Sequence, residues 1–96
     1  MPIKISSAIQ EKLLLKHRVS LTEVVECFEN REGNYLIDNR EDHRTDPPTL
    51  WFIAETNQGR SLKVVFIFIQ GHIHIKTAYE PNEKETGIFT LKGKLI

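Results

Sequence analysis

The segment 61–69 (SLKVVFIFI) constrains the fold of this chain more than any other part of the sequence. Its β-branched and aromatic residues favour an extended strand. Both alternating sets of side chains are apolar apart from Lys63, which is typical of a strand that has neighbours on both sides and cover on both faces. We therefore expect this segment to be the central strand of a sheet.

Strand patterns also precede and follow this segment. Residues 50–56 and 72–80 are rich in strand-forming residues, and the turns at 57–59 and 70–71 are short enough for antiparallel hairpins. Strict alternation along the last strand predicts that Tyr79 lies on the same face of the sheet as the isoleucines of that strand. The two expected sets are Ile73, Ile75, Thr77 and Tyr79 on one face, and His72, His74, Lys76 and Ala78 on the other.

The N-terminal part of the chain has helical periodicity. Ser6 or Ser7 can cap a first helix that runs to about His17. A second helix is expected to begin at the capping-box segment 20–23 (SLTE) and to end near Asn30. The expected apolar stripes are Ile9, Leu13 and Leu14 on the first helix, and Leu21, Val24, Val25 and Phe28 on the second.

These patterns predict a single α+β domain over residues 1–96. Two N-terminal helices are expected to pack on one face of an antiparallel β-meander, with short strands at 2–5 and 35–38. The segment that begins at Pro81 favours a short C-terminal helix, interrupted at Gly87. The residues expected in the core include Val24, Phe28, Val64 and Phe66.

Composition and charge exclude several classes of protein. The chain is 40% hydrophobic and 27% charged, as in an ordinary globular domain, and no apolar run approaches the roughly 20 residues that span a bilayer. The N-terminus has no hydrophobic signal segment, and the single cysteine, Cys27, fits a reducing compartment, so a cytoplasmic location is expected. The net charge of +0 removes the argument for nucleic-acid binding that a strongly basic domain would provide.

Two histidines on the last strand raise the question of a metal site. His72 and His74 are expected on one face, close enough to share a metal ion. Zinc needs further ligands, for which the candidates are His43 and Glu55, and the simpler interpretation is an exposed edge strand with polar outward positions. We therefore expect neither a metal nor another cofactor, and we interpret Cys27 as a structural thiol.

A charged loop and a basic helix end are candidates for contact with phosphate. The loop 39–48 has no apolar side chain apart from two prolines. Within it, Arg40, His43 and Arg44 combine guanidinium groups with a residue that titrates near neutral pH. The segment 16–18 (KHR) adds three basic side chains at the end of the first helix. The alternative interpretations are a solvated loop with internal ion pairs and a histidine favoured by the helix dipole.

The order of several short motifs resembles one known family. A helix that ends in KHRV is followed by SLTE and CFEN in the second helix, then by the charged loop, by GRSLKVVF in a strand, and by IKTAYEP. This order is similar to that of the BrnT-like branch of the RelE-type toxin superfamily, from bacterial toxin–antitoxin modules, over about residues 5–83. Similar small proteins carry an ADP-ribosyl-(dinitrogen reductase) hydrolase label. That label does not fit, because that hydrolase family is larger, all-helical and uses acidic clusters around magnesium.

The resemblance implies a RelE/BrnT-like fold and a metal-independent ribonuclease that cuts mRNA, including mRNA on the ribosome, and is neutralised by a cognate antitoxin protein. Such chemistry needs a base for the ribose 2′-OH, an acid for the leaving oxygen and cations for the phosphate. The family pattern matches at Lys16 and His17, whereas relatives often have arginine where this chain has Tyr79. The candidate catalytic residues are His17, His43, Arg44 and Tyr79, and the candidate RNA-binding residues are Lys16, Arg40, Lys63 and Lys76.

Two other hypotheses remain open from the sequence. The neutral charge balance and the missing arginine favour a non-catalytic binding module on the same fold. A small metal or ligand site at His72 and His74 is the third hypothesis. Growth arrest on expression without a partner protein would separate the toxin from the binding module.

Overall fold

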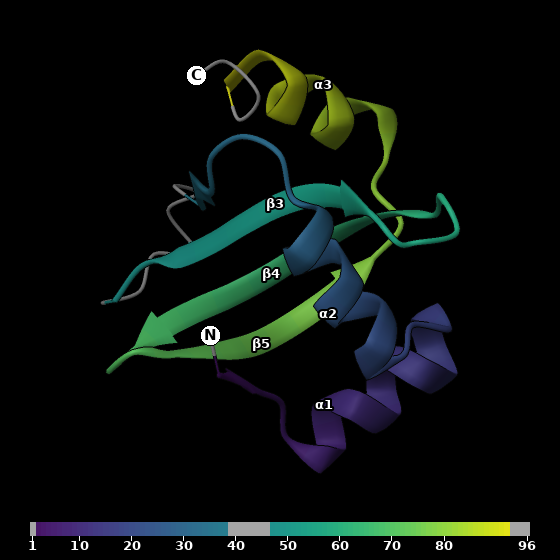
Figure 1. The fold of residues 1–96 in the computed structure, drawn as a ribbon, viewed down its shortest axis with the longest axis vertical. Coiled ribbons are helices and arrows are strands. Elements are labelled where there is room, and N and C mark those ends of the chain that lie inside the picture. Colours follow the sequence, from purple (N-terminus) through teal and green to yellow (C-terminus); the bar gives the residue numbers. More distant parts are fainter. Residues whose placement is uncertain (1, 39–46, 93–96) are drawn as a thin grey trace.

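The computed structural model of the chain describes residues 2–38 and 47–92. The helical segments are α1 (Ser7–Lys12), the π-helical turn η1 (Leu13–His17), α2 (Leu21–Asn30) and α3 (Glu83–Lys92). The strands are β1 (Ile3–Lys4), β2 (Leu36–Ile37), β3 (Thr49–Glu55), β4 (Ser61–Ile69) and β5 (His72–Tyr79). Figure 1 shows these helices arranged around a twisted sheet. Among the described residues, no helix is both long enough and apolar enough to cross a membrane.

The five strands form one sheet in the order β1-β5-β4-β3-β2. Strands β2 to β5 follow the predicted antiparallel meander, with β4 in the centre. The prediction of a purely antiparallel sheet is wrong, because β1, within the predicted strand 2–5, pairs in parallel with β5, Ile3 opposite Ile73. A parallel neighbour requires a crossover connection, and the elements between β1 and β5 provide it. The fold is therefore α+β with a mixed sheet.

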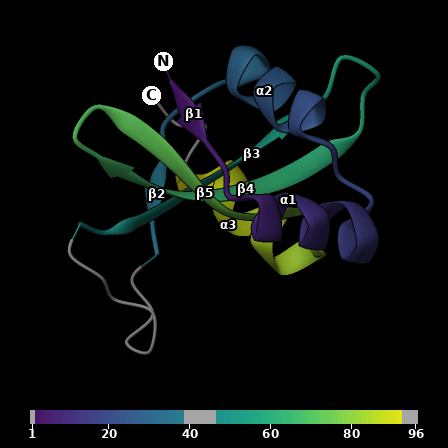
Figure 2. The same ribbon diagram turned by 90° about the horizontal axis from the view of Figure 1, so that it is seen from below.

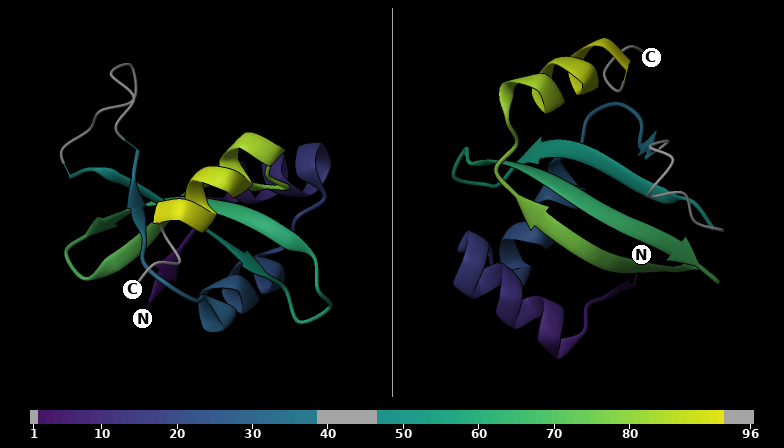
Figure 3. Two further views of the ribbon diagram at one scale, coloured as in Figure 1. Left: turned by 90° about the horizontal axis from the view of Figure 1, so that it is seen from above. Right: turned by 180° about the vertical axis from the view of Figure 1, so that it is seen from behind.

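Helices cover both faces of this sheet, and not one face as predicted. Figures 2 and 3 show α2 on one face and α3 on the other, while α1 and η1 contact β5. On the α2 face, the ring centroid of Phe28 lies 4.8 Å from that of Phe52 and 5.3 Å from that of Phe66. On the α3 face, the ring centroids of Trp51 and Phe89 lie 6.0 Å apart. Both faces of the central strand are thereby covered, as its apolar pattern requires.

The predicted core is confirmed in most positions. Val24, Val64 and Phe66 are at most 1% exposed, and Phe28 is partly buried against the same cluster of side chains. Cys27, which the sequence places on the flank of its helix, is fully buried. The core therefore includes the side chains packed between α2 and the sheet, and Trp51 and Phe89 add to it on the face under α3.

Both predicted helix starts are confirmed. The Ser6 hydroxyl accepts a hydrogen bond from the Ile9 N–H at 3.1 Å, and Ser20 and Glu23 form the reciprocal capping box at the start of α2. The predicted interruption at Gly87 is wrong, since α3 continues through it. A single glycine weakens a helix by only about 1 kcal/mol relative to alanine. That cost does not end a helix whose next turn is anchored by the buried Phe89.

The first helix departs from its predicted phase. Its hydrogen bonding changes at Leu13 from the α to the π pattern, which places an extra residue in the last turn. Leu13 is buried but Leu14 is 57% exposed, so the prediction that Leu14 continues the apolar stripe is wrong. The turn ends at Arg18, which has a left-handed φ of 55°. This ending places the His17 ring beside β5.

A β-bulge at Lys76 reverses the alternation of side chains along β5. Lys76 has no partner on β4, and this extra residue moves the side chains that follow it to the other face of the sheet. The predicted faces of Thr77, Ala78 and Tyr79 are therefore wrong. Tyr79 pairs with Lys63 on the α3 face and does not share a face with the isoleucines. The pairs on either side of the bulge are Val65–Thr77 and Phe66–Ile75.

Candidate functional site

Lys63 and Tyr79 lie opposite each other on β4 and β5, under the start of α3. Both donate a hydrogen bond to the same atom of Glu85: the Lys63 Nζ lies 2.7 Å from Oε2, and the Tyr79 hydroxyl lies 2.8 Å from it. Distances this short are typical of hydrogen bonds to a charged group. Two donors from adjacent strands thus converge on one anionic oxygen.

The ammonium group of Lys63 is held in a nearly closed environment. Its side chain is only 8% exposed, and Nζ lies 4.5 Å from the ring centroid of Trp51 and 5.7 Å from that of Tyr79. Aromatic faces attract a cation, but a desolvated ammonium also needs a close anion to remain charged. Glu85 is that anion. The sequence placed Lys63 correctly in the central strand but gave no sign of this enclosure.

Glu85 occupies the first turn of α3 and performs two tasks. One oxygen, Oε1, accepts from the Asn82 N–H at 3.0 Å, while the Glu85 N–H donates to the Asn82 side chain at 2.8 Å. This reciprocal pair is a capping box, and it leaves Oε2 free to face the sheet. Burial acts to raise the pKa of Glu85, but hydrogen bonds from Lys63, from the Asn82 N–H and from Tyr79 outweigh burial and hold that pKa below its usual value. Glu85 is therefore ionised at neutral pH.

Tyr79 and His17 complete the site with one group that holds a proton and one that can accept a proton. Burial, and then the hydrogen bond to Glu85, raise the pKa of Tyr79, so its hydroxyl keeps its proton. The His17 ring centroid lies 5.6 Å from that of Tyr79. Burial, and then the positive charges of Lys16 and Lys12, lower the pKa of His17, so its imidazole is neutral at pH 7. We call His17, Lys63, Tyr79 and Glu85 the Glu85 cluster.

Arg60 fixes the end of η1, and with it the position of His17. Its guanidinium donates to the backbone carbonyls of His17 at 2.9 Å and Arg18 at 2.7 Å, which are left without helical partners. The same group forms ion pairs with Glu23 and Glu80, each at 3.0 Å. Arg60 therefore ties the helical segments to the ends of β4 and β5.

The structure brings together some of the residues predicted from the sequence and separates others. Tyr79 lies near both His17 and Lys63: its ring centroid is 5.6 Å from that of His17 and 5.7 Å from the Lys63 Nζ. Lys16 and Lys76 are exposed, and neither forms a hydrogen bond or ion pair with that cluster in the part of the chain that the structure describes. The predicted loop residues Arg40, His43 and Arg44 lie outside the described residues, so their roles stay predictions.

Sequence reasoning missed two residues of this region, Arg60 and Glu85. The spacing Pro81-Asn82-x-x-Glu85 is a helix-start signal that could have marked Glu85 as fixed at the beginning of α3. No local pattern could have identified the partners of Arg60, because they come from three distant segments.

The histidines of β5 gain no further metal ligand. Among the described residues, no group of three or more histidine, cysteine, aspartate or glutamate side chains could hold a metal ion. Glu55 pairs with the first residue of β4 and His72 with the last, so the two lie at opposite ends of the sheet. His43 lies outside the described residues. Burial, and then the charges of Glu23 and Glu26, raise the pKa of Cys27 to about 12, which agrees with a structural thiol.

A groove of about 650 Å³ opens beside the cluster, between α3 and the strands β2 and β3. Trp51 and Ile88 provide apolar walls, Lys63, Lys84 and Lys92 provide positive charge, and Asp38 and Glu85 provide negative charge. The groove therefore combines an aromatic surface with charges of both signs.

No family model matches the chain. A search of curated proteins likewise finds no match.

Proposed function

We propose that this chain is a metal-independent ribonuclease, the toxin of a bacterial toxin–antitoxin module of the BrnT-like type. One observation carries the proposal: the Lys63 ammonium and the Tyr79 hydroxyl converge on a single anionic oxygen, and the Tyr79 ring lies next to the neutral imidazole of His17, with 5.6 Å between the two ring centroids. A phosphate oxygen has the same charge and hydrogen-bonding capacity as the Glu85 oxygen that now occupies this point. The motif order that resembles BrnT-like toxins supports the same function.

Each group has a role in cleavage of a phosphodiester. His17 takes the proton of the ribose 2′-OH, and the resulting oxygen attacks the adjacent phosphorus. Lys63 stabilises the negative charge that develops on the phosphoryl oxygens. Tyr79 gives its proton to the 5′ oxygen as the bond from phosphorus to that oxygen breaks. The products are a 2′,3′-cyclic phosphate and a free 5′-hydroxyl, so no metal and no external water is needed in this step.

For RNA to bind, the Glu85 carboxylate has to leave the point where both donors converge. Phe89 is the buried residue of α3, and the contacts of Lys63 and Tyr79 with this helix run through Glu85. A shift at the start of α3 therefore exchanges one anion for another. Lys84 and Lys92 line the adjoining groove and would meet the RNA backbone there.

The same proposal assigns roles to the loop residues and names the partners of the chain. Arg40, His43 and Arg44 remain candidates for phosphate contact and proton transfer, with Lys16 and Lys76 as further RNA-binding residues. We propose an antitoxin protein and mRNA, including mRNA on the ribosome, as partners, and the bacterial cytoplasm as the location. Neither a metal nor a cofactor has a role in the proposed chemistry.

The test is cleavage by the purified full chain in the presence of EDTA. A labelled 20-nucleotide RNA and a translated mRNA on purified ribosomes are the two substrates, and a 2′-deoxy version of the RNA is the control that removes the nucleophile. We expect cleavage with a 2′,3′-cyclic phosphate end, and growth arrest when the chain is expressed without a partner. Intact RNA in both assays together with normal growth would overturn the proposal, and cleavage lost in EDTA but restored by zinc would redirect it to His72 and His74.

A non-catalytic binding module is the second candidate, and one observation favours it. Both donors of the cluster are already satisfied by Glu85, so the cluster is complete without a ligand. Binding of the 20-nucleotide RNA without cleavage, unchanged by His17→Gln, would identify the chain as such a module.

A further inference from the structure

The outer edge of β3 is only partly paired. Its neighbour β2 reaches as far as Trp51, and residues 52–55 have no strand beside them on that side within the described residues. Alternate residues of an antiparallel strand direct their N–H groups to the same edge. The Thr49 carbonyl faces the outer edge, because it accepts from the Asp38 N–H at 2.8 Å. By the same alternation, the backbone N–H and C=O groups of residues 53 and 55 also face the outer edge.

The chain itself turns away from this edge. Continued in the same register, β2 would place residues 32–35 opposite 52–55. Instead, Gly33 has a φ of 85°, which breaks the extended path. The Tyr35 ring packs on the α2 face, with its centroid 5.6 Å from that of Phe52, and the Arg31 guanidinium lies 4.3 Å from the Tyr35 centroid. These contacts hold the segment in a position from which it cannot pair with β3.

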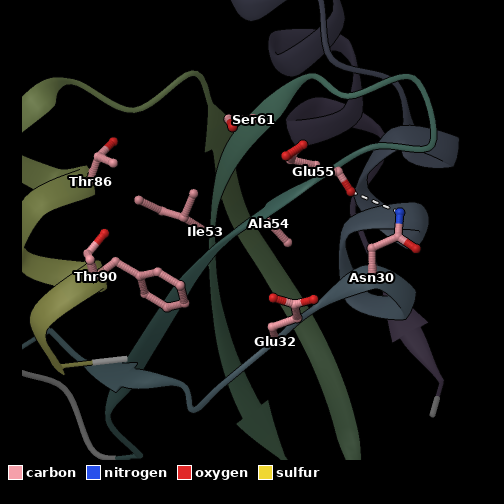
Figure 4. Close-up of a pocket in the computed structure, with 9 residues that line it drawn as sticks. Asn30, Glu32, Ile53, Ala54, Glu55, Ser61, Thr86 and Thr90 are labelled. Carbon is pink, nitrogen blue, oxygen red and sulfur yellow. Dashed lines mark hydrogen bonds between the residues drawn. The ribbon is translucent and has the colours of Figure 1, made fainter. Parts of the chain in front are cut away.

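A pocket of about 340 Å³ lies along this open edge. Figure 4 shows Thr86 and Thr90 of α3 on one side of the pocket and Asn30 and Glu32 on the other, with β3 between them. The floor is apolar where Ile53 and Phe89 approach, and the Asn30 side chain bonds to the Glu55 carbonyl at 2.9 Å. An unpaired strand edge and a pocket therefore coincide.

The charged side chains that line this pocket are all negative. Glu32 and Glu55 are exposed at its rim, and no lysine, arginine or histidine is among the residues that line it. The rim therefore favours a positively charged occupant. A second copy of this chain placed edge to edge would bring further carboxylates to the same rim, which disfavours a homodimer through β3.

We propose that the open edge of β3 binds an extended segment of a partner protein that carries a lysine or arginine side chain. The segment adds a strand beside residues 52–55 and continues the line of β2, with its backbone bonded to Ile53 and its cation between Glu32 and Glu55. Four residues of strand at about 3.3 Å each fit this stretch. This surface is separate from the Glu85 cluster, so the inference does not depend on the ribonuclease proposal.

The first experiment measures amide exchange in the full chain by NMR. The Ile53 and Glu55 N–H groups face the open edge, whereas those of Phe52 and Ala54 face β4. We expect exchange at Ile53 and Glu55 to be at least tenfold faster than at Phe52 and Ala54. Equal protection of the four amides would show that the edge is already closed, by residues 32–35 or by a second copy, and would overturn the proposal.

The second experiment selects peptides from a random nine-residue library displayed on phage, with the full chain as target. We expect enriched peptides to contain a lysine or arginine within a strand-forming sequence, and their synthetic forms to slow exchange at Ile53. The Glu32→Lys/Glu55→Lys variant should weaken their binding at least tenfold. Glu29→Lys, an exposed site on α2 outside the pocket, is the matched control and should leave binding unchanged.

Three outcomes would overturn the inference: no enrichment, enrichment of acidic peptides, or binding unaffected by the charge reversal. Methylation of alternate peptide amides should also abolish binding if a strand is added, because it removes the donors that pair with β3. RNA cleavage by the Glu32→Lys/Glu55→Lys variant is measured in parallel. A failure of peptide binding with cleavage intact would therefore count against this surface alone.

Discussion

Two cations near the start of β4 have opposite surroundings. The Arg60 guanidinium bonds to two backbone carbonyls of the first helical segment and to two carboxylates, and its side chain is 27% exposed. The Lys63 ammonium is more buried, at 8% exposed, and among the described residues its ion pair is with Glu85. One cation is thus held by many groups at the surface, and the other by one group in the interior.

The two cations differ in how firmly the rest of the fold holds their partners in place. The carbonyls of His17 and Arg18 are part of the backbone, so Arg60 keeps its position as long as the helix end is intact. Glu85 belongs to α3, whose buried residue is Phe89. Arg60 therefore organises the fold, whereas under the proposed function Lys63 exchanges Glu85 for a phosphate of the RNA. The predictions below test this division, in order of decreasing effect.

The largest effect is expected at His17. Arg60 holds the backbone of this residue in place, and Lys63 stabilises the charge that forms when His17 acts as the base. His17→Gln removes the base and should lower RNA cleavage at least 100-fold, which is about 2.7 kcal/mol of transition-state stabilisation. His72→Gln, a histidine of β5 whose Nδ1 lies 3.1 Å from the Gln70 carbonyl, is the matched control and should cleave at the parental rate. Cleavage by His17→Gln within threefold of the parent would remove His17 from the site.

Arg60 should matter most for stability. Arg60→Met leaves two helix-end carbonyls without their donor, so we expect the free energy of unfolding to fall by about 2–3 kcal/mol in urea denaturation. The ion pair with Glu80 adds little to this, because Glu80 is 66% exposed and solvent screens the pair. Arg18→Met is the control, an exposed side chain whose loss should change stability by less than about 0.5 kcal/mol. Equal losses in the two variants would contradict the assigned role of Arg60.

The contrast between these two cations also shows which structural features could be predicted from the sequence. Local patterns predicted the capping box at Ser20 and Glu23, the central strand β4 and the meander from β2 to β5, because each depends on neighbouring residues. The same alternation failed at Lys76, where one unpaired residue reverses the faces that follow. Similarly, the π turn at Leu13 shifted the apolar stripe of the first helix.

The candidate site was predictable only in part. His17, Lys63 and Tyr79 were named from the sequence, but the contact of Tyr79 with Lys63 depends on the bulge. Arg60 and Glu85 were missed, since their partners are distant in sequence and no periodicity links them. Residue types predicted which chemistry was available, whereas long-range pairing determined which groups meet.

A smaller effect is expected when Lys63 loses the charge of its partner. Glu85→Gln keeps an amide oxygen as acceptor and a cap for α3 but removes the charge that faces the buried ammonium, so stability should fall by about 1–2 kcal/mol. RNA affinity should rise 3- to 10-fold at low salt, because the cation becomes available to phosphate. Glu83→Gln, in the same turn but exposed, should change neither quantity. An unchanged or lower RNA affinity of Glu85→Gln would contradict the exchange of anions.

The smallest predicted effect is a shift in the titration of His17. Because burial, and then Lys16 and Lys12, lower the pKa of His17, its NMR titration in the free chain should have a midpoint below 6.5. The folded chain then binds this proton less tightly than the unfolded chain. The stability due to neutral His17 is therefore complete above pH 6.5 and is lost as the pH falls through the folded pKa.

The contribution of the two lysines can be separated from that of burial. Lys12→Met/Lys16→Met removes both charges, so the midpoint should move up while remaining below 6.5, since burial is the largest cause. RNA cleavage by the parent should rise with pH along the same curve, because only the neutral imidazole can accept the 2′ proton. A midpoint at or above 6.5 in the parent would mean that the ring is solvated and its contact with Tyr79 absent. His17 would then be a surface residue held in place by Arg60 without a share in the chemistry of Lys63.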